Sequence, residues 1–519
     1  MPTLNWIGKE KVLTHHQDVP YHVLNEEYTY NADSSDNLII HGDNLAALKS
    51  LLPRYEGRVK CIYIDPPYNT GNEGWVYNDK VNDPKILKWL HEVVGKEGDD
   101  LSRHDKWLCM MYPRLRLLHR LLATDGVMFI SIDDNEFNYL SLVLEEIFGR
   151  VNHVETLVWK KSYGGGSKSK HIVNLHEYIC FYAKDISRLG ELTLPPDQDV
   201  LKYYKFTDDK IEERGPYRLQ PLATTSMDER PNLRYPILFN GEEIWPEKQW
   251  QWSKERVTNA LANDELVIAK KKGAWSVNYK QYLKSVEGGE RGKKMYSIID
   301  GIYTQQGTSE LRSVLGITSF TFPKPPRLVQ DLIQLATKEG DLILDSFAGS
   351  GTTAHAILNL NKSDGGNRKF ILVEMEDYAE RITAERVKRV INGYADKEGT
   401  GGSFTYCTIG EPLFLPDNLL NEAIGEERIR EYVWYTETTL PFAQPESSNP
   451  FYLGTKDGTG YYFYYERDSL TTLDHEFLGT ITQPAGTYVI YADTCLLSKA
   501  FMQQHNIIFK KIPRDITRF

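Results

Sequence analysis

The chain has 519 residues, and its 41% hydrophobic and 26% charged side chains are typical of a globular protein long enough for several domains. The net charge of −11 argues, taken alone, against a nucleic-acid partner, although local basic patches can still bind a polyanion. No apolar run approaches the roughly 20 residues of a membrane span, and the N-terminus lacks an apolar signal core.

Residues 37–185 alternate between predicted strands and predicted helices. The stretch "NLIIHGDNLAALKSLL" predicts a strand, a turn and a helix, and "VKCIYIDPPY" predicts the next strand. A helix ("DKWLCMMYPRLRLLHRLL"), a strand ("GVMFISID") and a helix that Gly149 ends ("NEFNYLSLVLEEIFG") follow. Such repeating units predict an α/β fold with a mostly parallel, doubly wound sheet that carries helices on both faces.

The alternation stops after residue 185 and resumes after residue 310. Residues 186–310 are rich in Tyr, Trp, Lys, Pro and Gly, and we interpret them as an inserted domain or long loops. Residues 311–398 again alternate helix and strand, and residues 399–519 form a C-terminal α+β section with a hairpin that turns near Asp457-Gly458. Residues 1–36 remain as an N-terminal arm.

The strand before residue 65 ends in an unusually stiff loop, "YIDPPYNTG". Each proline fixes its own φ and restricts the residue before it, so Asp65, Pro66 and Pro67 are held rigidly where the strand ends. A plain connection would use Asn-Gly or Asp-Gly instead. A rigid loop that presents a carboxylate and the ring of Tyr68 indicates a site, although a turn capped by a packed tyrosine is the alternative.

A second motif, "DLILDSFAGSGTTAHAILNL", places a glycine turn between a strand and a helix. Gly349 and Gly351 let the backbone approach a ligand at the carboxyl end of the strand, where open α/β sheets bind cofactors. The next strand ends in Glu374, which is placed to accept hydrogen bonds from both hydroxyls of a ribose. The two features together favour a nucleoside cofactor, while the glycine turn alone fits a tight connection without a ligand.

The two motifs together resemble those of the amino-methyltransferases of DNA. "DPPY" is similar to their catalytic motif, "FAGSGT" to their cofactor motif, and the order of the two is the permuted order of the β class. The stretches "IIHGDNLAALKSL", "GVMFISIDDNE", "HEYICFYAK" and "YADTCLLSKAFMQQHNIIFKKI" resemble the Mod subunit of type III restriction-modification systems. The resemblance implies a Rossmann-like methyltransferase that transfers a methyl group from S-adenosyl-L-methionine to adenine N6 in DNA by base flipping.

The resemblance assigns roles to the segments defined above. Residues 37–185 and 311–398 would be the catalytic and the cofactor-binding halves of the methyltransferase domain. The insert at 186–310 would recognise the target sequence, and residues 399–519 would hold two Mod subunits together or bind the nuclease. The C-terminal aromatic hairpin fits a plain hydrophobic core equally well.

The resemblance also implies which residues act on the target base. Asp65 would accept a hydrogen bond from the amino group, and the Pro66 carbonyl, held by Pro67, would accept the second. Tyr68 would stack on the flipped base, and Trp159 or Tyr163 is a candidate for its other face. The pair His176-Glu177 is interpreted as structural, and no metal site is expected.

For the cofactor, the family pattern falls on residues around the glycine turn and on two other segments. Asp43 would accept from the adenine amino group of the cofactor, although it could equally be a helix N-cap, and Glu374 would bind the ribose. Lys324 and Pro325 in "FPKPPRL" would contact the methionine portion, although the lysine could also be solvated. The methionine end would be held by Asp345, Phe347, Gly349, Gly351 and Thr352.

Basic stretches within residues 160–176 and 270–294 are candidate contacts for DNA phosphates, although solvated surfaces would look the same. The candidates are Lys160, Lys161, Tyr163, Lys168, Lys170, Lys270, Lys271, Lys272, Lys293 and Lys294. Five scattered cysteines argue against a disulfide framework or a zinc site and predict a cytoplasmic protein.

Three functions from two classes compete at this stage. The leading one is the modification subunit of a type III system, acting on double-stranded DNA as a homodimer with a helicase-nuclease restriction subunit. A stand-alone methyltransferase without a nuclease partner is the second, and cytosine N4 stays open as its target. The third is a DNA-binding specificity subunit in which the cofactor is only structural.

Overall fold

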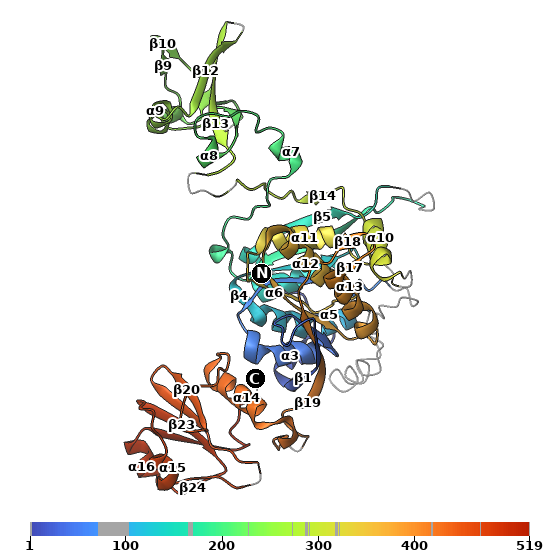
Figure 1. The fold of residues 1–519 in the computed structure, drawn as a ribbon, viewed down its shortest axis with the longest axis vertical. Helices are drawn as coiled ribbons and strands as arrows, with labels where there is room; N and C mark the ends of the chain where they lie inside the picture. Colours follow the sequence, from blue (N-terminus) through green and yellow to red (C-terminus); the bar gives the residue numbers. More distant parts are fainter. Residues whose placement is uncertain are drawn as a thin grey trace. The chain divides into compact units, whose positions relative to one another are not determined.

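The computed structural model describes residues 3–70, 103–164, 170–226, 228–271, 273–285, 289, 291–316, 320, 322–416, 419–467 and 469–517. The chain forms two compact units (Figure 1). The larger comprises Met1–Glu191 and Tyr296–Phe519, and the smaller comprises Leu192–Met295. Within the described ranges, no helix has the length and apolar character that a membrane span requires. The same ranges contain no cluster of His, Cys, Asp and Glu suited to a metal ion.

A ten-stranded sheet in the order β1-β19-β2-β16-β15-β3-β4-β6-β5-β14 forms the centre of the larger unit. Neighbouring strands from β19 through β4 are parallel, whereas β6 runs antiparallel to β4 and β5, and β1 antiparallel to β19. The bounds are His22–Tyr30 (β1), Leu38–His41 (β2), Val59–Ile64 (β3), Leu122–Ile132 (β4), His153–Lys160 (β5), His176–Ala183 (β6), Ile298–Ile299 (β14), Leu342–Asp345 (β15), Lys369–Glu374 (β16) and Phe404–Pro412 (β19).

Both faces of the parallel strands are covered. Successive strand residues point to opposite faces, and Ile62 and Ile64 of β3 belong to one hydrophobic cluster with helices α3, α5 and α6. Cys61 and Tyr63 are equally buried on the other face, where α11 packs against β3 and α12. The helices are Asn44–Tyr55 (α3), Arg103–Leu121 (α5), Phe137–Phe148 (α6), Pro326–Ala336 (α11) and Thr352–Asp364 (α12). The predicted fold class is therefore confirmed.

Strand β3 lies beside β15, although more than 270 residues separate them along the chain. Ile343 and Leu344 of β15 pair with Cys61 and Ile62 of β3 in parallel register. Parallel neighbours end at the same edge of a sheet, so the loops that follow β3 and β15 emerge side by side. In the sequence, the smaller unit at Leu192–Met295 comes between the segments that form β3 and β15.

Several elements lie in the sheet although the sequence pattern grouped them elsewhere. Strand β1 comes from the expected arm at 1–36, and β19 comes from the expected C-terminal section. Strand β14 and helix α10 (Thr304–Leu315), expected in the insert at 186–310, belong to the larger unit. These strands pair with segments that are distant in the sequence, which local periodicity does not reveal.

The rest of the C-terminal section has its own four-stranded sheet, in the order β20-β21-β23-β25. Its strands are Tyr452–Lys456, Thr459–Phe463, Thr487–Ala492 and Ile507–Lys511, and helix α14 (Glu426–Thr438) packs on it. Asp457 and Gly458 both have positive φ values, of 50° and 76°, between β20 and β21. This is the geometry of a tight hairpin turn, so the predicted hairpin is confirmed.

The smaller unit has a three-stranded antiparallel sheet in the order β12-β13-β7. These strands are Leu266–Lys271, Ala274–Tyr282 and Tyr217–Pro221, and helix α9 spans Lys254–Ala262. The core of this unit is built around the fully buried Trp250 and Leu222. It is a compact body with its own hydrophobic cluster.

Candidate active site

A cavity of about 740 Å³ lies where the loops after β3, β4 and β15 emerge from the sheet. Asp65, Pro66, Pro67 and Tyr68 line it from the β3 side. From the β15 side it is lined by Asp345, Phe347, Gly349 and Thr352, and from other segments by Asp133, Trp159, Lys161, Glu177 and Lys324. The two motifs that the sequence analysis singled out thus share one cavity.

The Asp-Pro-Pro-Tyr loop is fixed from behind by buried polar contacts. The indole of Trp107 donates a hydrogen bond to the Pro67 carbonyl at 2.7 Å. Asn69 follows in the left-handed region, with φ of 55°, and its side-chain amide donates to the Arg103 carbonyl at 3.1 Å and to Glu136. Because Glu136 is fully buried, this contact anchors the turn that aims Tyr68.

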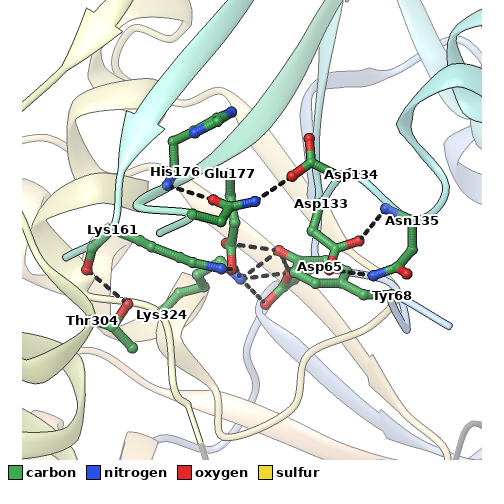
Figure 2. A network of polar contacts seen from close by, with 11 residues as sticks. Asp65, Tyr68, Asp133, Asp134, Asn135, Lys161, His176, Glu177, Thr304 and Lys324 are labelled. Carbon is green, nitrogen blue, oxygen red and sulfur yellow. Dashed lines mark hydrogen bonds and ion pairs between the residues drawn. The ribbon is translucent and has the colours of Figure 1, made fainter. Parts of the chain in front are cut away.

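The Asp65 carboxylate is held by a lysine from the segment before α11 (Figure 2). The Lys324 ammonium donates to the two Asp65 oxygens at 2.8 and 2.9 Å and to the Tyr68 hydroxyl at 2.7 Å. Tyr68 in turn donates to Asp65 at 2.9 Å and to Glu177 at 3.1 Å. Lys161 pairs with Glu177 at 3.0 Å. Two acids and two lysines therefore form one neutral group.

Burial and charge act in opposite directions on these groups. Burial raises the pKa of the Asp65 carboxyl, and the Lys324 ammonium opposes that rise. Burial alone would lower the pKa of Lys324, but Asp65 and Glu177 outweigh it and raise the pKa. For Glu177, Lys324 and Lys161 outweigh burial and lower its pKa. Lys324 and Glu177 are therefore charged at neutral pH.

The glycine turn before α12 is held closely against the segment that leads into helix α13 (Glu385–Asn392). Gly351 has φ of 79°, and a Cβ there would meet the Thr383 carbonyl oxygen at 3.0 Å, so only glycine fits without strain. The fully buried Arg386 donates to the hydroxyls of Ser350 and Thr352, at 2.7 and 2.8 Å. Side chains of this segment thus fix the cavity wall.

Asp345 lies beneath the same turn and is almost fully buried. It accepts hydrogen bonds from the Phe347 backbone N–H and from the Thr353 hydroxyl. Burial raises the pKa of Asp345 to about 7 despite these donors. The carboxyl is therefore partly protonated at neutral pH, and its contacts hold the backbone of the turn.

Four predicted cofactor residues, Asp43, Pro325, Gly351 and Glu374, are not among those that line the cavity. The Glu374 carboxylate accepts from the backbone N–H groups of Gly349 and Glu376, at 2.7 and 3.0 Å. Asp43 caps helix α3 through the Ala46 N–H at 3.0 Å, as the structural alternative for it required. Pro325 is the N-cap residue of α11. Their roles toward a cofactor stay predictions.

Four of the nine predicted DNA-binding lysines form ion pairs among the described residues. Lys160 pairs with Asp300, Lys161 with Glu177, Lys270 with Glu242 and Lys293 with Asp197. Lys294 donates to the Leu192 carbonyl, Lys170 is exposed, and Tyr163 packs its ring on Tyr303 at 3.6 Å between centroids. Lys168, Lys272 and the side chain of Lys271 lie outside the described residues.

Glu177 is the site residue that the sequence analysis interpreted as structural. It is the second residue of β6, which runs antiparallel to its neighbours, so the start of this strand reaches the edge where the parallel strands end. The two motifs direct attention to the loops that follow parallel strands, whereas Glu177 lies near the start of a strand. An acidic residue near the start of an otherwise mostly apolar strand, "HEYICFYA", is the signal available.

Comparison with known proteins finds a match that includes both motifs of the cavity. The chain matches the DNA methylase family over residues 59–385. It is 34% identical over 419 residues to the type III restriction-modification enzyme EcoPI Mod subunit of Escherichia phage P1, across 72% of this chain and 64% of that protein. It is 33% identical over 368 residues to the type II methyltransferase M.KpnI of Klebsiella pneumoniae, across 66% and 81%.

Among solved structures, a putative DNA modification methylase from Thermus thermophilus aligns over 72% of this chain and all of its own, at 15% identity and a TM-score of 0.34. The chain spans 56% to 64% of the length of the EcoPI, StyLTI and EcoP15I Mod subunits that it matches. Because the family match covers more than half of the 519 residues and includes both strand-end motifs, the chain belongs to the DNA methylase family.

Proposed function

We propose that this protein transfers a methyl group from S-adenosyl-L-methionine to adenine N6 of a base extruded from duplex DNA. The observation that carries the proposal is that Asp65 and the glycine turn line the same cavity. A volume of about 740 Å³ lies within the roughly 300–1,000 Å³ of small-molecule sites. An acceptor for an amino group and a cofactor turn are therefore within reach of one another.

The residues on the β15 side of the cavity fit the proposed cofactor. Phe347, Gly349 and Thr352 line the cavity on the side of the glycine turn, whereas Gly351 acts indirectly, because its missing side chain lets the turn pack against the Thr383 carbonyl oxygen. When bound there, S-adenosyl-L-methionine supplies an electrophilic methyl group, whose bonding electron pair stays on sulfur as the methyl passes to nitrogen. Asp345 and Arg386 act indirectly, since they hold the turn.

Asp65 acts on the nucleophile. The lone pair of an adenine amino group is delocalised into the ring, and a carboxylate that accepts from this group favours its pyramidal, nucleophilic form. Pro66 offers a carbonyl oxygen for the second N–H, and Tyr68 offers a ring face. The proton that nitrogen loses after methyl transfer has Asp65 as its nearest proposed acceptor.

Base extrusion costs a few kcal/mol and has to be offset inside the cavity. Stacking of one base on an aromatic ring contributes about 1–3 kcal/mol, and a hydrogen bond to a charged acceptor about 1.5–3 kcal/mol. Tyr68 and Asp65 together thus roughly offset extrusion, whereas neither does so alone. Trp159 also lines the cavity and is the better-placed candidate for the second face of the base.

We further propose that the protein is the modification subunit of a type III system. The relatives named as Mod subunits of type III restriction-modification enzymes support this. We propose that the protein works as a homodimer together with a restriction subunit. The compact unit at 192–295 would then recognise the target sequence. A stand-alone enzyme is the alternative, supported by the similarity to M.KpnI, and a neighbouring helicase-nuclease gene would decide between the two.

A radiolabelled methyl-transfer assay on mixed-sequence duplex DNA tests the activity. The wild-type protein is expected to label adenine, and Asp65→Ala is expected to lower the rate about 10²–10⁴-fold. Asp125→Ala is the matched control, because this exposed acid pairs with Lys60 at the opposite end of the sheet. No incorporation by the wild type, or label on cytosine, would contradict the proposal. Binding of target DNA without any methylation would favour the specificity subunit.

A further inference from the structure

The Lys324–Asp65 ion pair raises a problem for the proposed chemistry. Both carboxylate oxygens of Asp65 accept from the Lys324 ammonium, at 2.8 and 2.9 Å, and one of them also accepts from Tyr68 (Figure 2). A base amino group that reaches Asp65 competes for the same lone pairs. An ammonium beside that amino group also opposes the positive charge that develops on nitrogen during methyl transfer.

Lys324 cannot simply lose its partner. Its side chain is 9% exposed, and leaving a buried ammonium unpaired costs several kcal/mol. The cation therefore has to move to another acid when the base arrives. It also lies 4.9 Å from the Tyr68 ring and 5.8 Å from the Trp159 ring, which offer weak attraction but no charge to neutralise it.

Glu177 is placed to take over the ammonium. Its carboxylate lies 3.5 Å from the Lys324 nitrogen, so a small side-chain movement reaches the about 2.8 Å of a charged hydrogen bond. Glu177 is 11% exposed, and it already receives Lys161 and the Tyr68 hydroxyl. Burial alone would raise the pKa of Glu177, but Lys324 and Lys161 outweigh burial and lower this pKa. The Glu177 carboxylate is therefore ionised and can accept the ammonium.

We propose that Glu177 is a positioning residue that receives the Lys324 ammonium when the target base occupies Asp65. Lys324 is then a removable counter-ion of Asp65 rather than a contact of the cofactor. The inference rests on the proposed function, since it explains how Asp65 becomes available to the base. No bond is formed or broken in this step, and the group of two acids and two lysines stays neutral throughout.

The inference is tested by changing the net charge of the group of two acids and two lysines. Glu177→Gln removes the second acid, leaves a net charge of +1 in the group and confines Lys324 to Asp65. The kcat for methylation of mixed-sequence duplex DNA is expected to fall at least tenfold. The double variant E177Q/K324M removes one charge of each sign and restores neutrality, so its kcat is expected to recover above that of E177Q. A residue with only a structural role would not give such a recovery.

Lys324→Met alone supplies an independent readout. It leaves Asp65 without its cation, so the acidic limb of its pH–rate profile is expected to move to higher pH than in the wild type. Glu155→Gln is the matched control, because Glu155 lies on the neighbouring strand β5 and hydrogen-bonds only the adjacent Thr156 N–H among the contacts described. Thermal unfolding and the Kd for S-adenosyl-L-methionine are measured for each variant.

Two results would overturn the inference. One is an E177Q protein with wild-type kcat, and the other is a double variant no more active than E177Q. If E177Q fails to fold, Glu177→Asp keeps the charge but shortens the side chain that receives Lys324, and a Glu177→Asp protein with wild-type kcat would then overturn the inference. A wild type that methylates nothing would instead refute the proposed function, so the two failures are distinguishable.

Discussion

The buried carboxyl of Asp345, beneath the glycine turn, makes the stability of the folded protein depend on pH. Its pKa of about 7 lies well above the usual 3.8 because burial disfavours the charged form. Between about pH 4 and pH 7 the folded protein holds a proton that the unfolded chain has released. Stability therefore falls as pH rises through this window, and the contribution is level above it.

Asp345→Asn is predicted to remove this dependence. The amide keeps an acceptor for the Phe347 N–H, and the Thr353 hydroxyl can turn from donor to acceptor. In the wild type, Asp345 should lower the free energy of unfolding by up to about 4 kcal/mol between pH 4 and pH 7, and this decrease should be absent from Asp345→Asn. Urea unfolding at a series of pH values measures it. The exposed Asp33→Asn is the control. An unchanged slope in Asp345→Asn would show that another group binds the proton.

At the scale of elements, helix α10 positions the segment that carries Lys324. Gly307 lies inside this helix, and a Cβ there would lie 2.2 Å from the Pro323 carbonyl oxygen and 2.9 Å from the Lys324 carbonyl carbon. Alanine in a helix is normally about 1 kcal/mol more favourable than glycine. Here that gain is outweighed, because backbone atoms cannot yield as a flexible side chain can.

Gly307→Ala is therefore predicted to displace the Lys324 segment from Asp65. The methylation rate should fall at least tenfold, and the midpoint of thermal unfolding should drop. Gly479→Ala is the matched control, because Gly479 ends helix α15 (His475–Gly479) and a Cβ there meets nothing within 4 Å. Equal activity and stability of Gly307→Ala and the wild type would mean that the helix is free to move away.

The sequence predicts the elements whose signal is local. The apolar strand β3 and the glycine turn after β15 can be recognised from residue types alone, as can the hairpin at Asp457-Gly458. Glu177 escapes because the direction of β6 depends on which distant strands it pairs with. Lys324 is recognisable as a site residue, but its partner Asp65 lies 259 positions away and only the folded chain brings them together.

At the scale of the whole molecule, the cavity and the smaller unit are built from different parts of the chain. The described residues that line the cavity all come from the larger unit, and the smaller unit has a hydrophobic core of its own. The chain enters and leaves the smaller unit at one place. There Leu194 and Lys293 exchange two backbone hydrogen bonds, of 2.8 and 2.6 Å, as an antiparallel pair.

Replacing residues 195–292 by a short Gly/Asn turn is thus predicted to leave the larger unit folded, since Leu194 and Lys293 already face each other as a hairpin would require. The shortened protein should bind S-adenosyl-L-methionine with wild-type affinity in calorimetry, because its cavity is intact. Sequencing of methylated DNA from cells that express it should show no modified sites, because target recognition is assigned to the removed unit. Methylation at the same sites as the wild type would place recognition in the larger unit, where the exposed Lys170 and the Tyr163–Tyr303 pair would then be the first candidates.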